Sequence, residues 1–145
     1  VSSDEATPSG NGIAAMSLLK LGLLLSRSDY IQAAEGTLDY ASKAMIDAPM
    51  AHGSLLSCLQ NLEATPRVII IRGEQDIINH WRQQCQADFN PQHLVFAIPD
   101  DCDNLPEALA AKCGQQSEPL AYVCEGFSCL PPINDLVQLK QHLSA

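Results

Sequence analysis

The chain has 145 residues, 46% of them hydrophobic, and 17 Asp and Glu residues against 8 Lys and Arg residues give a formal net charge of −9. A chain of this length buries roughly two-thirds of the surface that its unfolded form exposes, enough for one compact unit or two small ones. Because Lys and Arg supply most of the affinity for phosphate groups, the acidic balance argues against DNA, RNA and anionic membranes as partners.

The longest apolar stretch, residues 13–25, is shorter than the roughly 20 residues that a bilayer requires, and Lys20 interrupts it. No basic segment of the kind that opens a signal peptide precedes it. The cysteines lack the regular spacing of a small disulfide-rich domain; they are Cys58, Cys85, Cys102, Cys113, Cys124 and Cys129. We therefore predict a cytoplasmic protein with reduced thiols and no membrane span.

The first part of the chain has helical periodicity. After a turn-forming run at residues 7–12, residues 13–25 are apolar on nearly every face, which predicts a helix surrounded by other elements. A second helix begins near Ser28, with apolar residues at three- and four-residue steps. A third follows Pro49 and carries a leucine stripe. We predict an all-helical region over residues 11–62.

The second part alternates strands and helices. The β-branched run at residues 68–71 predicts a buried parallel strand. The other predicted elements are a helix over 75–88, a strand over 94–98, a helix over 105–113, a strand over 120–124 and a helix over 134–143. Such alternation is typical of right-handed crossovers and a parallel sheet. The strand at residues 68–71 is placed in the middle.

The predicted fold class is therefore α/β. Three N-terminal helices, in a segment over residues 1–65, are followed by a small three-stranded parallel β-α-β-α-β-α subdomain over residues 66–145.

Cys124 and Cys129 are a candidate thiol pair, because they lie between the end of a predicted strand and the start of the last helix. Thiolates gain from the positive end of a helix dipole, which would suit a redox pair, a disulfide or part of a metal site. The spacing is not that of a C-x-x-C motif, and no His or further Cys is close in sequence. Structural thiols that behave as small buried hydrophobic residues are the favoured interpretation.

Ser9, Gly10 and Asn11 lie at the entrance of the first helix. They predict a helix cap, since Ser or Asn oxygens accept hydrogen bonds from the first helical N–H groups. The alternative is that the same three residues line a ligand pocket.

Other motifs give no complete site. Residues 73–76 open a helix after a strand but lack the glycines of a phosphate loop, and Glu74 and Asp76 would repel phosphate. The acidic run at residues 100–103 lacks the glycine and distal Glu of a calcium loop. The four histidines are scattered, and no G-x-S-x-G elbow is present. We predict no metal and no cofactor, and the catalytic residues, if the chain has any, stay unassigned.

Three segments together resemble the YyaL-like family, which includes the spermatogenesis-associated thioredoxin-domain proteins: residues 8–15, residues 68–70 and the run from Ala121 through Cys129. The resemblance covers essentially the whole chain. It implies the C-terminal region of a larger protein, in which a thioredoxin-like domain and an α/α toroid similar to six-hairpin glycosidases come first. The three helices would then be the last of the toroid. The chain departs from the family pattern at Gly126, where Asn is usual, and at Ile133, where Thr often caps the last helix.

This resemblance implies that the parent protein binds or acts on a carbohydrate-like ligand, by analogy of fold. One alternative is a thiol-redox module in which Cys124 and Cys129 exchange with the thioredoxin-like domain. Another is a purely structural or self-association domain. On any of these hypotheses the chain is not catalytically complete by itself, and its first partner is the rest of the parent protein.

Overall fold

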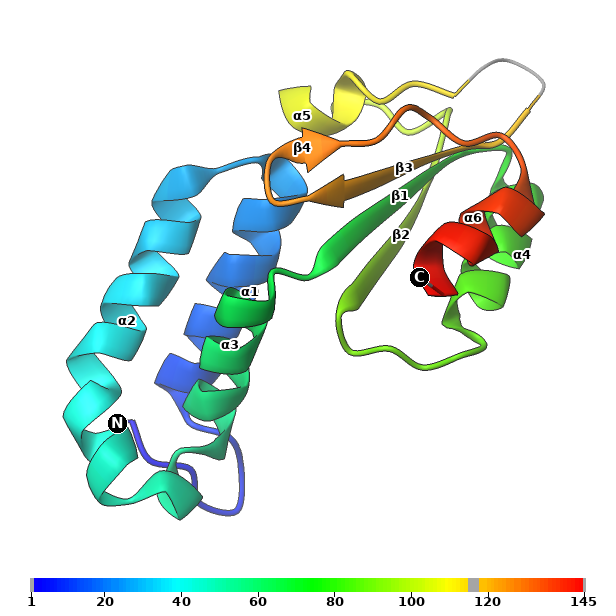
Figure 1. Cartoon of the computed structure of the whole chain (residues 1–145). Helices are drawn as coiled ribbons and strands as arrows, with labels where there is room; N and C mark the ends of the chain where they lie inside the picture. The colour runs from blue at the N-terminus through cyan, green and yellow to red at the C-terminus, as the bar shows by residue number, and fades with distance from the viewer. Residues whose placement is uncertain (1, 115–117, 145) are drawn as a thin grey trace. The chain divides into compact units, whose positions relative to one another are not determined.

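The computed structural model describes residues 2–114 and 118–144, which form two compact units, Val1–Thr65 and Pro66–Ala145. Figure 1 shows helices α1 to α3 in the first unit and a sheet with its helices in the second. Within the described residues, no helix is long and apolar enough to cross a membrane.

The first unit contains the three predicted helices, α1 (Gly10–Leu25), α2 (Ser28–Asp47) and α3 (Gly53–Ala64). A short 3-10 turn, η1 (Pro49–Ala51), precedes α3. Ser9 caps the start of helix α1, and its side chain accepts a hydrogen bond from the N–H of Gly12. Ser26 caps the end of the helix and has a left-handed backbone with a φ of 54°. The helix cap predicted from Ser9 is therefore present.

Helix α1 packs against both α2 and α3, and small residues let the helices approach closely. A Cβ atom at Gly22 would lie 2.6 Å from Cγ1 of Ile31 on α2 and 3.0 Å from the carbonyl oxygen of Arg27. The buried apolar residues of the unit lie on the facing sides of the helices and include Ala15, Leu19, Ala34, Leu38 and Leu55. Within the described residues, however, α1 is not surrounded as its composition predicted, because Ile13 and Leu21 are 53% and 44% exposed.

The second unit is a mixed α/β fold with a four-stranded sheet of order β2-β1-β3-β4. Its elements are β1 (Arg67–Gly73), α4 (Gln75–Gln86), β2 (His93–Pro99), α5 (Glu107–Ala110), β3 (Leu120–Glu125), β4 (Ser128–Cys129) and α6 (Leu136–Ser144). Strands β1 and β2 are parallel, with Arg67 opposite His93 and Gly73 opposite Pro99. Strand β1 lies between β2 and β3, as the sequence predicts.

The prediction of a fully parallel, three-stranded sheet is wrong. Strand β3 runs antiparallel to β1, with Leu120 opposite Arg72 and Glu125 opposite Arg67, and β4 adds a fourth strand by a hairpin. The helix predicted over 105–113 in the connection before β3 is also wrong in length, because α5 is a single turn.

The described part of this connection stays near the edge where β2 ends. The N–H of Gly114 donates to Oδ1 of Asp100 at 3.2 Å, and Nη1 of Arg72 donates to the carbonyl oxygen of Leu109 at 3.4 Å. Strand β3 starts at the same edge of the sheet, where Leu120 lies opposite Arg72.

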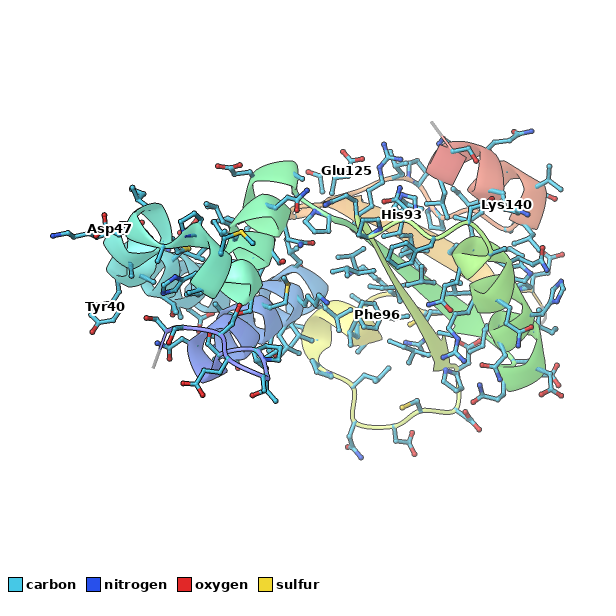
Figure 2. All side chains as sticks on the ribbon, turned by 90° about the horizontal axis from the view of Figure 1, so that it is seen from below. Tyr40, Asp47, His93, Phe96, Glu125 and Lys140 are labelled. Atoms are coloured by element: carbon cyan, nitrogen blue, oxygen red, sulfur yellow. A yellow bond between two sulfur atoms is a disulfide. The ribbon has the colours of Figure 1, made fainter. Side chains whose placement is uncertain are left out.

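One face of the sheet carries the main core of the unit, under helices α4 and α6 (Figure 1). Ile69 and Ile71 of β1 pack there with Trp81 of α4 and Leu139 of α6. Alternate residues point to the other face, and Figure 2 shows Phe96 on the side of β2 away from α4. The last helix begins at Leu136, two residues later than predicted.

Substitution of Gly22 tests the close approach of α1 and α2. Gly22→Ala would bring a methyl group into Ile31, so we expect a loss of about 1–3 kcal/mol in the free energy of unfolding. The matched control is Gly36→Ala on α2, where no atom lies within 4 Å of the new Cβ. That change should stabilise the chain by about 0.5–1 kcal/mol through helix propensity. Urea unfolding followed by circular dichroism measures both; equal effects would contradict the packing.

Candidate functional site

Cys124 and Cys129 form a disulfide across the β3–β4 hairpin, with an S–S distance of 2.03 Å. The two residues are directly opposite each other in the antiparallel register, next to the Glu125–Ser128 pair that closes the turn. The N–H of Leu130 donates to the carbonyl oxygen of Val123 on the far side of the pair. The structure thus joins the two predicted thiols, although reduced thiols were expected for the chain as a whole.

The turn of this hairpin depends on Gly126. Gly126 is the first central residue of the turn, and its φ is 57°. A positive φ at this residue is typical of the I′ and II′ turns, whose backbone twist matches that of the two strands in a hairpin with a two-residue loop. Glycine reaches this conformation without the steric cost that a side chain brings. The glycine at position 126 is therefore compatible with a tight turn that brings the cysteines together.

The two sulfur-bearing residues differ in exposure. Cys124 is 5% exposed, whereas Cys129 is an exposed residue of the short strand β4 at the edge of the sheet. A groove of about 260 Å³ adjoins Cys129 and is lined also by residues of β1, β3 and α6, namely Arg67, Val123, Glu125 and His142. Access to the disulfide is therefore from the Cys129 side.

Arg67 places a positive charge in this groove. Its Nε atom lies 2.6 Å from Oε1 of Glu125, and its Nη1 donates to the carbonyl oxygen of His142 at 3.0 Å. The side chains of the pair are 32% and 61% exposed, so the ion pair contributes at most about 1 kcal/mol to stability. Because its contribution is small, the pair can rearrange when a charged group approaches.

The remaining cysteines separate into buried and exposed thiols. Burial raises the pKa of the Cys58 thiol and raises the pKa of the Cys85 thiol to about 11, so both are neutral core residues. Cys102 and Cys113 are free and exposed. Among the described residues, no group of three or more His, Cys, Asp and Glu side chains could hold a metal ion.

Ser9 belongs to a polar cluster that the sequence did not reveal. Its N–H donates to Oδ1 of Asp4 at 2.7 Å, and its hydroxyl lies 3.1 Å from the hydroxyl of Ser54. The N–H of Ser54 donates to Oδ2 of Asp4 at 2.7 Å, and its hydroxyl also donates to that carboxylate. The cluster therefore ties the N-terminal segment to the start of α3.

The hydroxyl of Ser54 contributes most to lowering the pKa of Asp4 to about 2, followed by the N–H groups of Ser54 and Ser9. Of the three predicted pocket residues, Ser9 is 4% exposed and engaged in this cluster, Gly10 is exposed, and Asn11 is half-buried. The structure thus places Ser9 in a structural role. Asp4 and Ser54 gave no sequence signal, because 50 residues separate them.

Comparison with known proteins gives one distant relative. The chain is 22% identical over 141 residues to "Uncharacterized protein B0495.5" of Caenorhabditis elegans. The match covers 95% of this chain but 19% of the relative, so the chain spans about a fifth of that protein's length. No family model matches the chain, and no solved structure matches it.

The Asp4 cluster predicts a loss of stability in acid. The folded pKa of about 2 is below the ordinary value of 3.8, so the stabilisation is complete above pH 3.8 and is lost as the pH falls from there toward 2. Asp4→Asn should lower the free energy of unfolding at pH 7 and flatten its decline between pH 4 and pH 2. Urea unfolding at a series of pH values measures this.

The matched control is Asp47→Asn, which removes a carboxylate from the exposed end of α2 (Figure 2). This variant should keep the acid dependence of the unaltered chain. Parallel pH profiles for Asp4→Asn and the unaltered chain would show that the cluster does not hold the carboxylate in its charged form.

Proposed function

We propose that the second unit takes part in thiol–disulfide exchange, with Cys124 and Cys129 as the exchanging pair and a dithiol of another protein or domain as the partner. The observation that carries this proposal is the disulfide with one accessible and one buried cysteine, beside a groove that contains Arg67. The difference in exposure between Cys124 and Cys129 supports different roles for the two sulfur atoms.

The Sγ of the exposed residue Cys129 is the atom that an incoming thiolate attacks, in line with the usual mechanism of exchange. A bond forms between the partner sulfur and Cys129, and the bond between Cys129 and Cys124 breaks. Cys124 leaves with the electron pair and takes up the proton that the partner thiol released. The second thiol of the partner then attacks its own first sulfur, so that Cys129 leaves as a thiol. The partner dithiol is oxidised to a disulfide, and the hairpin disulfide is reduced to two thiols.

The unit should keep its fold through this cycle. Strand β3 is paired with β1 over six residues, from Leu120 to Glu125, and this pairing does not need the disulfide. The loop that the disulfide closes is short, with a sequence separation of 5, and the chain-entropy relation gives about 2 kcal/mol for such a loop. A bond that adds so little to stability is better suited to reversible exchange than to holding the fold together.

Arg67 is a positioning residue in this proposal. A guanidinium in the groove favours the negatively charged form of a thiol that enters beside Cys129, and the thiolate is the reactive form. The cytoplasmic location that the sequence predicts is compatible with this function, because cytosolic disulfides are usually transient, catalytic or redox-sensing.

Single-cysteine variants test the assigned roles. In Cys124→Ser the exposed Cys129 should form a mixed disulfide with a peptide dithiol in which one sulfur carries a leaving group. The same Cys129 thiol should also be alkylated quickly. In Cys129→Ser the buried Cys124 should react roughly tenfold or more slowly, because its burial limits the access of the reagent to the sulfur. Intact mass of the native chain after timed alkylation, followed by peptide mapping, measures both rates.

Cys113→Ser is the matched control, since it removes an exposed free thiol from the same unit and should leave reduction of the disulfide unchanged. In the unaltered chain, a dithiol should reduce the pair without loss of the circular dichroism signal. A disulfide that resists a dithiol until the chain unfolds would refute exchange and leave a structural role.

The carbohydrate-like ligand remains a second proposal, which rests on the resemblance to the YyaL-like family. The engagement of Ser9 with Asp4 and Ser54 leaves Asn11 as the member of the predicted trio with a half-exposed side chain. At least one sugar from a broad panel should raise the melting temperature of the parent protein, and Asn11→Ala should reduce that rise. A broad sugar panel without any shift would count against it.

A further inference from the structure

Strand β2 forms one edge of the four-stranded sheet, and β1 is its partner strand among the described residues. The N–H of Arg67 donates to the carbonyl oxygen of Gln92 at 2.8 Å, and the N–H of Asp100 donates to that of Gly73 at 3.1 Å. In an extended strand the N–H and C=O of one residue point to the same side, and those of the next residue point to the opposite side. The even-numbered residues of β2 therefore bond to β1, and the odd-numbered residues point away from it.

Two residues in the middle of β2 have outward backbone groups without a partner. Toward the ends of the strand, the N–H of His93 donates to the carbonyl oxygen of Asn90 at 3.0 Å, and Pro99 has no N–H. Between these ends, the N–H and C=O groups of Val95 and Ala97 make no hydrogen bond within the described residues. The free edge thus offers two donors and two acceptors at a fixed spacing.

The side chains of β2 do not protect this edge. Folded proteins commonly block a sheet edge with a charged side chain, a bulge or a proline within the strand. Residues 94–98 are uncharged and partly exposed, and they pair with β1 in continuous register without a bulge. Val95 and Ala97 pack against the core under α4, whereas Phe96 lies on the other face (Figure 2). A further strand could therefore continue both the hydrogen bonds and the apolar surface.

The spacing of the free groups matches a second copy of the same strand. In an antiparallel pair, two opposed residues exchange both of their hydrogen bonds. If two copies of β2 pair about Phe96, Val95 of each copy lies opposite Ala97 of the other, and all the free groups of these two residues are satisfied. Sliding the copies to the next register in either direction would place one of the two residues opposite Pro99 or His93. There the N–H is missing or already used.

Charge also favours the antiparallel arrangement. Asp100 and Asp101 follow β2 directly, whereas residues 90–92 before it are uncharged. Antiparallel pairing places the two carboxylates of one copy beside the uncharged start of the other, whereas parallel pairing would place like charges side by side. The net charge of −9 on each copy opposes association at long range, and salt screens this repulsion.

We propose that this chain pairs with a second copy of itself through β2, in a two-fold symmetric dimer with one continuous sheet. A two-fold interface uses the same surface of both copies, and addition of a strand to a sheet edge is a common mode of recognition. Phe96 of one copy lies opposite Phe96 of the other, with Leu94 opposite Ile98 on either side. This surface shares no residue with the Cys124–Cys129 pair, so each proposal can fail without the other.

Amide hydrogen exchange of the unaltered chain tests the register. Raising the concentration from micromolar to millimolar in high salt should convert monomer to dimer in analytical ultracentrifugation. The N–H groups of Val95 and Ala97 should then exchange roughly tenfold or more slowly, because they gain a partner. Those of Leu94 and Phe96 already bond to β1; they are the matched controls and should change much less.

Two results of this experiment would overturn the proposal. A chain that stays monomeric at millimolar concentration would refute self-pairing and leave the edge to a strand from another protein or from the rest of the parent protein. A dimer in which the amides of Val95 and Ala97 keep their exchange rates would refute β2 as the surface.

Cross-linking tests the same pairing independently. The background is Cys102→Ser with Cys113→Ser, which removes the two exposed free thiols. In it, Phe96→Cys should form an intermolecular disulfide on mild oxidation, because directly opposed residues of this kind have Cα atoms about 4.5 Å apart, within the range of a disulfide. Tyr40→Cys on α2 is the matched control, since Tyr40 is 84% exposed (Figure 2), and it should cross-link at least several-fold less. Equal cross-linking of the two variants would refute the pairing.

Discussion

The pairing of β1 on both of its edges is the constraint on which the second unit depends. Four consecutive β-branched residues, Val68–Ile71, are each at most 1% exposed, so neither face of this strand can be left to solvent. Strand β2 is parallel to it on one side, and β3 is antiparallel on the other. These two pairings place Cys124 opposite Val68 near the start of β1 and Arg72 opposite Leu120 near its end. The disulfide and the buried Arg72 are therefore both positioned by one strand.

The elements that the sequence predicted well are those whose signal is local. Helix α1 follows from a long apolar run, α2 and α3 follow from three- and four-residue periodicity, and the buried run of β1 follows from its length and β-branched composition. The direction of β3 is not a local property. It depends on the path of the whole connection between β2 and β3, in which the predicted helix over 105–113 is the single turn α5, with Pro106 before it. The alternation of strands and helices therefore indicated the fold class but gave the wrong strand direction.

How well each polar cluster or cysteine pair could be predicted also depends on how far apart its residues lie in the sequence. Cys124 and Cys129 are five positions apart, so proximity could be inferred, whereas the hairpin that pairs them contains a strand of two residues, too short for any periodicity. The carboxylate of Asp4 and the hydroxyl of Ser54 meet through the packing of α1 on α3, which no short-range pattern encodes. Arg72 follows four apolar residues in β1, and its environment arises from loops after β2 and from α5.

The acidic surface has a consequence for the proposed disulfide exchange. With a net charge of −9, the chain repels an approaching thiolate, which is the form that reacts. A positive group beside the attacked sulfur offsets this repulsion locally, and Arg67 provides one in the groove that adjoins Cys129. Its ion pair with Glu125 is partly exposed and weak, so the guanidinium can turn toward an incoming anion at little cost. The same long-range field favours partners with a basic surface, because opposite charges raise the rate of encounter. Selection among dithiol partners would then depend on the charge around their thiols, and a partner with a basic rim would react fastest at low ionic strength.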